Sequence, residues 1–226
     1  VNRLMPYFIF KDQEEYIEYG KKKKDKSAEY AGGHYEPDKR RMMTFYTAGD
    51  ESGWAQEVIF HEGTHQLMHF IADYHSSSMM WFSEGVADYI AGFRVLPGGK
   101  YEVAKVNKRR FSEYQMLLKI RPQTLMSTKD LLEFSYGKRE AIFSDPKKKH
   151  EEKEFLFGRV YYQAWVTVYY FFKGANEEHR QKFLEYFKAE LKGEGGLSKA
   201  REIFGNLDLN TMDADIKKFF GSLNPD

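Results

Sequence analysis

The sequence contains no cysteine. This absence excludes disulfide bonds, thiolate metal ligands and a cysteine nucleophile, so any metal site must be built from histidine, aspartate or glutamate. The absence does not settle the compartment, because exported bacterial proteins often lack cysteine as well.

Long apolar runs and a signal-peptide pattern are also missing. No run of about eighteen apolar residues occurs, so we expect no membrane span. Residues Val1 to Phe10 lack the order of charged, apolar and small segments that marks a signal peptide. Since Val1 is not a start methionine, we expect a mature form or an excised domain. We expect an exported location, whether periplasmic, at the cell surface or secreted, with a cytoplasmic location as the alternative.

Neither sign of charge is in excess, because 35 basic residues stand against 34 acidic ones and the net charge is +1. Nucleic-acid binding draws on clustered positive charge, so nucleic acid is not an expected partner. Hydrophobic residues make up 42% of the 226 residues, enough for a sizeable core. We expect a single domain, 1–226, in which residues 1–104 hold the sheet and the metal-binding helices and residues 105–226 form a helical part.

The apolar pattern changes from strand-like to helical along the chain. Expected strands span 4–11, 29–36 and 40–47, with a brief extended piece at 101–104. Expected helices start at 13 and at 52 or 53, the latter running to about 72, and then span about 83–93, 108–119, 127–134, 155–173, 177–192, 197–204 and 211–221. The polar stretch 137–154 is expected to be a surface loop. This order predicts an α+β fold, with a small N-terminal mixed sheet packed on the helix at 52–72.

One short motif contains the main candidate site residues. In His61-Glu62-Gly63-Thr64-His65 the two histidines stand four residues apart, so on a helix both imidazoles share a face and can reach one ion. Glu62 projects from the neighbouring face and can contact a water at that ion. Such a five-residue pattern also arises by chance, and its alternative interpretation is two ordinary helix histidines.

The context favours a metal site over the chance pattern. The motif lies inside an apolar helical pattern, and catalytic zinc needs a third protein ligand while its fourth position stays open. Glu84 enters from the first turn of the next expected helix, which would pack against the first. His61, His65 and Glu84 together supply two imidazoles and one carboxylate, and the ligand types favour Zn²⁺, although cobalt or manganese could occupy the same site in vitro.

The segment Trp81-Phe82-Ser83-Glu84-Gly85-Val86-Ala87-Asp88-Tyr89 after HEGTH resembles the gluzincin metallopeptidases, the thermolysin and aminopeptidase type. The chain is similar in particular to little-characterised bacterial metallopeptidases with such a segment. The resemblance, strong over residues 54–92, implies the same three ligands and Glu62 as general base. It also implies that Asp88 accepts a hydrogen bond from a ligand histidine, the alternative being a surface aspartate.

The resemblance further implies an oxyanion donor from the helical part. Tyr161 is the first candidate and Tyr162 the second, while the alternative is that both belong to an aromatic core. Gluzincins also place an edge strand beside the cleft, where Gly32 and Gly33 would let an extended substrate approach; a plain bulge is the alternative.

The expected function is a zinc-dependent peptidase acting on a peptide or protein, as an endo- or oligopeptidase. An aminopeptidase is less favoured because the G-x-M-E-N segment of that type is absent near Gly33. The alternatives are an inactive binding module that kept the fold, and a zinc hydrolase of another amide or ester. His69 is expected to be a solvent or packing residue, and Met68 and Ile71 stand where metzincins carry glycine and histidine.

Overall fold

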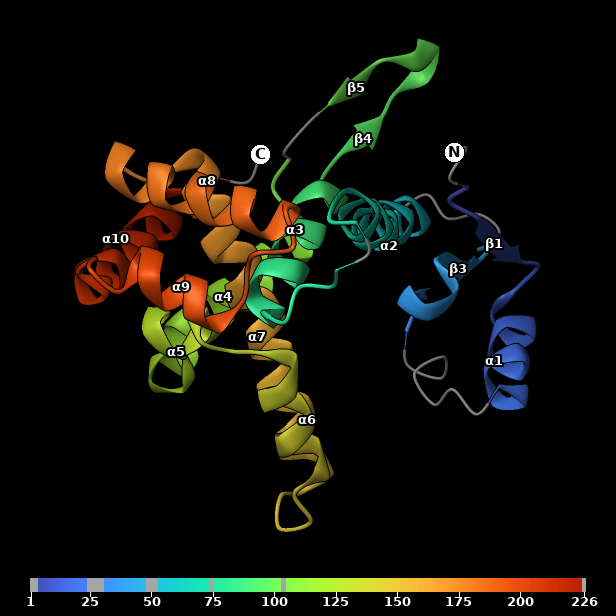
Figure 1. Ribbon diagram of the computed structural model, residues 1–226, viewed down its shortest axis with the longest axis horizontal. Coiled ribbons are helices and arrows are strands. Elements are labelled where there is room, and N and C mark those ends of the chain that lie inside the picture. The colour runs from blue at the N-terminus through green and yellow to red at the C-terminus, as the bar shows by residue number, and fades with distance from the viewer. Residues whose placement is uncertain (1–3, 24–30, 48–52, 74, 103–104, 225–226) are drawn as a thin grey trace.

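The fold is α+β, with a small mixed sheet near the N-terminus and a helical C-terminal part (Figure 1). A computed structural model describes residues 4–23, 31–47, 53–73, 75–102 and 105–224. The strands are β1 (Tyr7–Phe10), β2 (Gly33–Glu36), β3 (Arg41–Phe45), β4 (Arg94–Val95) and β5 (Tyr101–Glu102). The α-helices are α1 (Gln13–Lys22), α2 (Trp54–Ile71), α3 (Met80–Ala91), α4 (Lys108–Ile120), α5 (Thr128–Leu132), α6 (Tyr136–Ser144), α7 (His150–Lys173), α8 (Glu177–Leu191), α9 (Leu197–Phe204) and α10 (Leu209–Ser222).

The sheet has the strand order β1-β3-β2, in which β3 pairs parallel with β1 and antiparallel with β2. This mixed sheet confirms the predicted one. A parallel pair needs a crossover, and α1 provides part of it after the Asp12 side chain caps its first turn at the Glu15 amide. Tyr16 of α1 is fully buried against Phe45 of β3, so the helix closes one face of the sheet.

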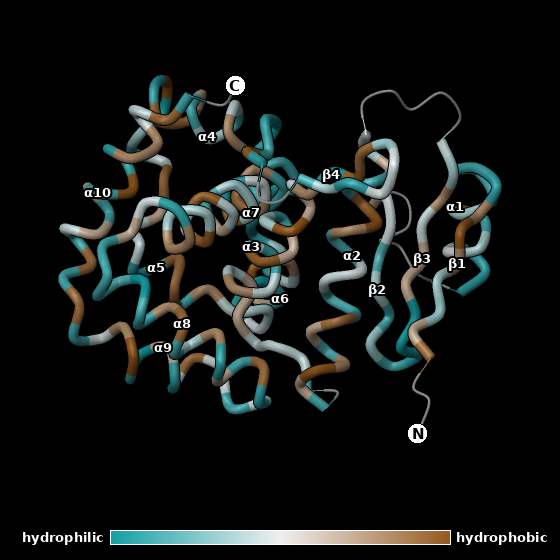
Figure 2. The backbone as a smooth tube through the Cα atoms, turned by 90° about the horizontal axis from the view of Figure 1, so that it is seen from above, coloured by the Kyte–Doolittle hydropathy of each residue, from teal (hydrophilic) through white to brown (hydrophobic). Residues whose placement is uncertain are grey.

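Helix α2 lies between the sheet and the helical part (Figure 2). Its side toward the sheet makes polar contacts: Gln66 donates to the carbonyl oxygens of Pro6 and Arg40 at 3.3 and 3.1 Å, and His69 Nδ1 lies 2.7 Å from the Tyr35 hydroxyl. The two bonds of Gln66 use backbone groups just before β1 and β3, whereas the bond of His69 joins two side chains. The predicted packing of the sheet on this helix is thereby confirmed.

Helix α3 packs between α2 and α7 and forms the centre of the helical part. Its first turn buries Met80, Trp81 and Phe82 completely, so α3 begins three residues before the predicted start at Ser83. Gly85 allows the close approach of α7, because a Cβ on this glycine would lie 2.6 Å from the carbonyl oxygen of Ala164. The aromatic core spreads from here through α7, α8, α9 and α10.

The predicted surface loop at 137–154 is wrong over most of its length, because residues 137–144 belong to α6 and residues 150–154 open α7; residues 145–149 connect the two helices. Ser135 caps α6 by accepting from the Lys138 amide, and the rings of Phe143 and Phe157 stack 4.2 Å apart. The lysines and glutamates occupy the solvated faces of these helices. Because they are so numerous, the sequence pattern did not reveal the few apolar residues that pack on the core.

Parts of the predicted segments fall on residues 29–30, 52 and 103–104, which lie outside the described residues. Across the part of the chain that is described, no helix is both long enough and apolar enough to cross a bilayer. The other predicted helices end within a few residues of the observed ends.

Replacing Gly85 with alanine is expected to lower the free energy of unfolding by about 1–3 kcal/mol, because the added methyl group must displace the α7 backbone. Gly137→Ala is the matched control, since a Cβ there meets only the Ser135 hydroxyl oxygen at 3.8 Å. The free energy of unfolding of this control should be unchanged or higher by up to about 1 kcal/mol, because alanine favours an exposed helix position more than glycine does. Urea unfolding measures both, and equal stability of the two variants would contradict this packing.

Candidate metal centre

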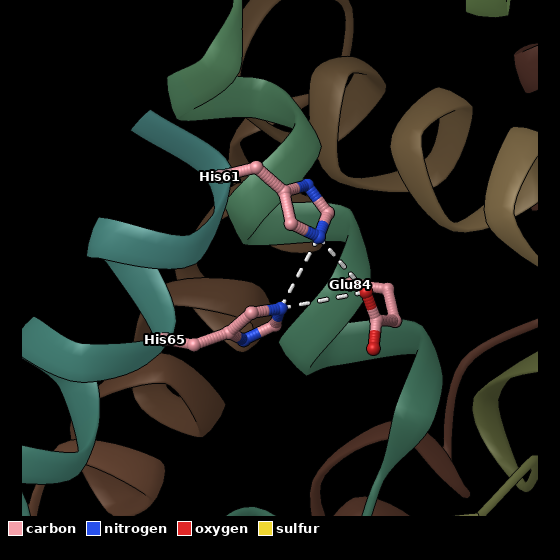
Figure 3. Close-up of side chains that lie close together, drawn as sticks. All are labelled: His61, His65 and Glu84. Atoms are coloured by element: carbon pink, nitrogen blue, oxygen red, sulfur yellow. Dashed lines mark hydrogen bonds and ion pairs between the residues drawn. The ribbon is translucent and has the colours of Figure 1, made fainter. Parts of the chain in front are cut away.

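Helices α2 and α3 bring His61, His65 and Glu84 together (Figure 3). His61 Nε2 lies 3.2 Å from His65 Nε2 and 3.2 Å from Glu84 Oε2. His65 Nε2 lies 3.5 Å from the same carboxylate oxygen. The spacing of four residues on α2 places both rings on one face, and α3 carries Glu84 to that face from its second turn. These residues are called the three-residue cluster below.

The three-residue cluster fits a divalent ion. In a tetrahedral zinc site with bonds of about 2.0–2.2 Å, ligand atoms lie about 3.3–3.6 Å apart. The three separations in the cluster are 3.2, 3.2 and 3.5 Å. Two imidazoles and one carboxylate are also a donor set of catalytic zinc, in which the fourth position is left to water or substrate. The residues that the sequence predicted as ligands therefore meet at the spacing that zinc requires.

Asp88 lies one turn after Glu84 and contacts the outer nitrogen of His61, with Oδ1 3.0 Å from Nδ1. Arg110 of α4 pairs with the same carboxylate, because its Nε lies 2.8 Å from Oδ2 and its Nη2 donates to Oδ1 at 3.3 Å. Burial alone would raise the pKa of Asp88, but the charges of Arg110 and His61 lower it. An ionised Asp88 holds the proton of His61 on Nδ1 and leaves Nε2 as the ligand atom.

The charges of the three-residue cluster support one another. Burial alone would lower the pKa of His61, yet the charge and hydrogen bond of Asp88, the hydrogen bond of Glu84 and the charge of Glu62 raise it well above the usual value. Burial likewise favours protonation of Glu84, but the two imidazoles hold its pKa well below the usual value. In the absence of a metal ion, a proton on His61 thus takes over part of the charge balance that a cation would provide.

Glu62 lies on the side of α2 that faces the sheet. Val58, Glu62 and Gln66 follow at intervals of four residues and share one stripe of the helix. The Val58 side chain fills the space where a Cβ on Gly33 would lie, and Gln66 donates to the carbonyl of Arg40. Glu62, half-buried between these contacts, is therefore directed toward the sheet and stands next to the first ligand histidine.

The two candidate tyrosines of α7 point to different neighbours. Burial raises the pKa of Tyr161 well above its usual value, and the nearby carboxylate of Glu84 adds to the effect. Tyr162 lies near the Glu113 carboxylate instead, and burial followed by the charge of that carboxylate raises its pKa. The Arg110 guanidinium covers both rings at 5.2 and 5.5 Å from their centroids. Of the two, Tyr161 is the one beside the three-residue cluster.

Residues 56–190, more than half of the chain, match the protein family described as "Protein of unknown function (DUF1570)". The chain belongs to this family. No curated protein and no solved structure matches it. The part of the chain that matches DUF1570 runs from α2 into α8, so it holds the three-residue cluster with Glu62, Asp88 and Tyr161.

Three further residues of the DUF1570 region contact the site and were not predicted. Tyr136 at the start of α6 donates its hydroxyl proton to Glu84 Oε1 at 2.5 Å, and Ser83 Oγ lies 3.2 Å from His65 Nδ1. Arg110, only 8% exposed, holds Asp88. No sequence signal marks Tyr136 or Arg110, since both come from distant helices, whereas Ser83 adjoins the motif and only its role was missed.

The predicted substrate glycines lie at the start of β2, with Gly32 just before the strand and Gly33 as its first residue, outside the DUF1570 match. A Cβ on Gly32 would lie 2.3 Å from the Trp54 ring, and one on Gly33 would lie 2.7 Å from the carbonyl of Met43 and 2.8 Å from Val58. Both positions therefore need glycine so that β2 can pack on α2 and β3. Their role in substrate binding stays a prediction.

His69 is not in the three-residue cluster, and its ring bonds Tyr35 of β2 as a packing residue. Its place one turn beyond His65 therefore serves the contact between α2 and the sheet.

The raised pKa of His61 gives a pH dependence that can be measured on the metal-free DUF1570 protein. Since the folded pKa lies above the usual 6.5, protonated His61 stabilises the fold fully below that pH. This contribution is lost as the pH rises through the folded pKa. In the presence of a chelator, the free energy of unfolding should therefore fall above pH 6.5, and His61→Gln should flatten the fall.

His150→Gln is the control for this titration, because His150 is exposed at the start of α7. It should leave the pH dependence of urea unfolding as in the wild type. An identical slope in the His61→Gln and wild-type proteins would contradict the assigned electrostatics.

Proposed function

We propose that this chain is a zinc-dependent metallopeptidase of the gluzincin type, acting as an endo- or oligopeptidase. The observation that carries the proposal is the convergence of His61 Nε2, His65 Nε2 and Glu84 Oε2 at 3.2–3.5 Å from one another. Two imidazoles and one carboxylate oxygen at these separations match the donor set and the spacing of a catalytic zinc site. The HEGTH motif and its glutamate from the following helix support the same conclusion.

When bound, zinc supplies Lewis-acid activation of water and of the substrate carbonyl. Glu62, beside His61 and half-buried, takes the proton of the attacking water and delivers it to the leaving amine. Tyr161 donates a hydrogen bond to the oxyanion that develops on the carbonyl oxygen. Its raised pKa suits this task, because the phenol keeps its proton at neutral pH.

The substrate proposed for this site is a peptide in extended conformation. Strand β2 stands at the edge of the described sheet and packs against α2. Glu62 belongs to the stripe of α2 that faces this sheet, so a peptide running beside β2 would carry its backbone past the general base. Extended peptides bind sheet edges through backbone hydrogen bonds, which places few demands on their side chains.

Replacing Glu62 with glutamine should lower peptide hydrolysis by about 10²–10⁴-fold, because the amide cannot accept the water proton. Zinc content should stay at the wild-type level, since Glu62 is not in the three-residue cluster. A peptide-library digest followed by mass spectrometry measures cleavage, and elemental analysis measures zinc. Glu154→Gln, an exposed position on α7, is the matched control and should cleave as the wild type does.

Unchanged cleavage by the Glu62→Gln protein would contradict the general-base assignment. A wild-type protein that binds zinc and cleaves no peptide in the library would contradict the peptidase. That result would favour a binding module or a hydrolase of other amides or esters.

A further inference from the structure

Two side chains outside the three-residue cluster connect two of its members. His65 Nδ1, the nitrogen turned away from the cluster, lies 3.2 Å from Ser83 Oγ. Glu84 Oε1, the oxygen turned away from the histidines, accepts the Tyr136 hydroxyl at 2.5 Å. The Ser83 side chain also lies near the Tyr136 hydroxyl, where it counteracts part of the rise in the pKa of that phenol. Ser83 and Tyr136 are therefore neighbours, and each contacts one ligand of the cluster on the side turned away from the ion position.

The chemistry of the groups limits the directions of these contacts. A carboxylate only accepts, so Tyr136 must donate its proton to Glu84 Oε1. The Tyr136 oxygen still has a lone pair for the neighbouring Ser83 proton, and Ser83 Oγ can then accept from His65 Nδ1–H. A proton on Nδ1 means that neutral His65 has its lone pair on Nε2, the atom directed at the three-residue cluster.

The backbone holds Tyr136 in place for this contact. The Tyr136 amide donates to the carbonyl of Ser78 at 2.9 Å, and the Met80 amide donates to the carbonyl of Phe134 at 3.1 Å. A β-bridge between Met79 and Ser135 lies between these bonds. The start of α6 is thus fastened to the start of α3, four residues before Glu84.

We propose that Ser83 and Tyr136 are positioning residues for the metal, a proposal that rests on the metal-binding part of the proposed function. Together they hold His65 in the tautomer that binds through Nε2. Tyr136 also occupies Glu84 Oε1, so the carboxylate offers the ion one oxygen, Oε2, and the remaining position stays open. Asp88 and Arg110 perform the corresponding task at His61, through separate residues.

The test is the zinc affinity of Tyr136→Phe, Ser83→Ala and the double variant, measured by competition with a chromophoric chelator. Loss of an outer hydrogen-bond partner of a metal ligand typically weakens binding about 10–100-fold, and each single variant should fall in this range. Because the two residues are neighbours and contact ligands of the same ion, the loss in the double variant should be smaller than the product of the two single losses. Tyr114→Phe is the matched control, a buried tyrosine in the core away from the site, and should bind zinc as the wild type does.

Urea unfolding of the metal-free variants separates positioning from folding. A merely structural role would lower stability and leave the zinc dissociation constant of the folded protein unchanged, which would overturn the proposal. Independent losses that multiply in the double variant would also overturn it. If Tyr136→Phe does not fold, the half-buried Ser83→Ala alone decides, with weakened zinc binding in support and unchanged binding against.

The failure of this proposal differs from the failure of the proposed function. If the wild type binds zinc and both variants bind it with the same affinity, the positioning role is overturned and the proposed peptidase is not affected. If the variants bind zinc more weakly but the wild type cleaves no peptide, the positioning role is supported and the peptidase is overturned. A wild-type protein that binds no zinc overturns both.

Discussion

The packing of α3 between α2 and α7 is the constraint on which the candidate site depends. Glu84 and Asp88 lie on α3 with only 5% and 2% of their surface exposed, so each carboxylate needs a partner inside the protein. His61 and His65 on α2 supply the partners of Glu84, while Arg110 and His61 supply those of Asp88. The helices must approach closely for these pairs to form, and the small residue Gly85 permits this on the α7 side.

The buried charges explain why so many helices converge on one place. Removing one partner from a buried ion pair leaves an uncompensated charge, which typically costs about 3–5 kcal/mol. Helix α4 therefore delivers Arg110, α6 delivers Tyr136, and both bond to carboxylates of α3. Hydrophobic burial of Trp81 and Phe82 holds the first turn of α3 in the core. The polar contacts of Glu84 and Asp88 and this aromatic packing together give α3 a single orientation.

Local patterns made part of this arrangement predictable. The interval between His61 and His65 determines a shared helix face, and the adjoining apolar residues indicate a helix, so these features follow from a few turns of chain. The order of strands before helices predicted the α+β fold in the same way. Glu84 and Asp88 could be named because their spacing on the next helix resembles a known family.

Contacts between distant segments could not be predicted. Tyr136 reaches Glu84 only because α6 forms and its start pairs with the residues before α3. The many lysines after Gly137 suggested a loop, since composition reports the solvated face of a short helix and conceals its few apolar contacts. Gly32 illustrates the converse: a glycine pair indicates close approach, but the sequence does not say that the approaching group is the Trp54 ring.

The most direct test of a metal at this centre is the crystal structure of the zinc-loaded protein at the zinc absorption edge, together with zinc stoichiometry by elemental analysis. The account predicts one zinc ion per chain, with an anomalous peak about 2.0–2.2 Å from His61 Nε2, His65 Nε2 and Glu84 Oε2. Absence of bound zinc after dialysis, or a peak at another set of residues, would contradict it.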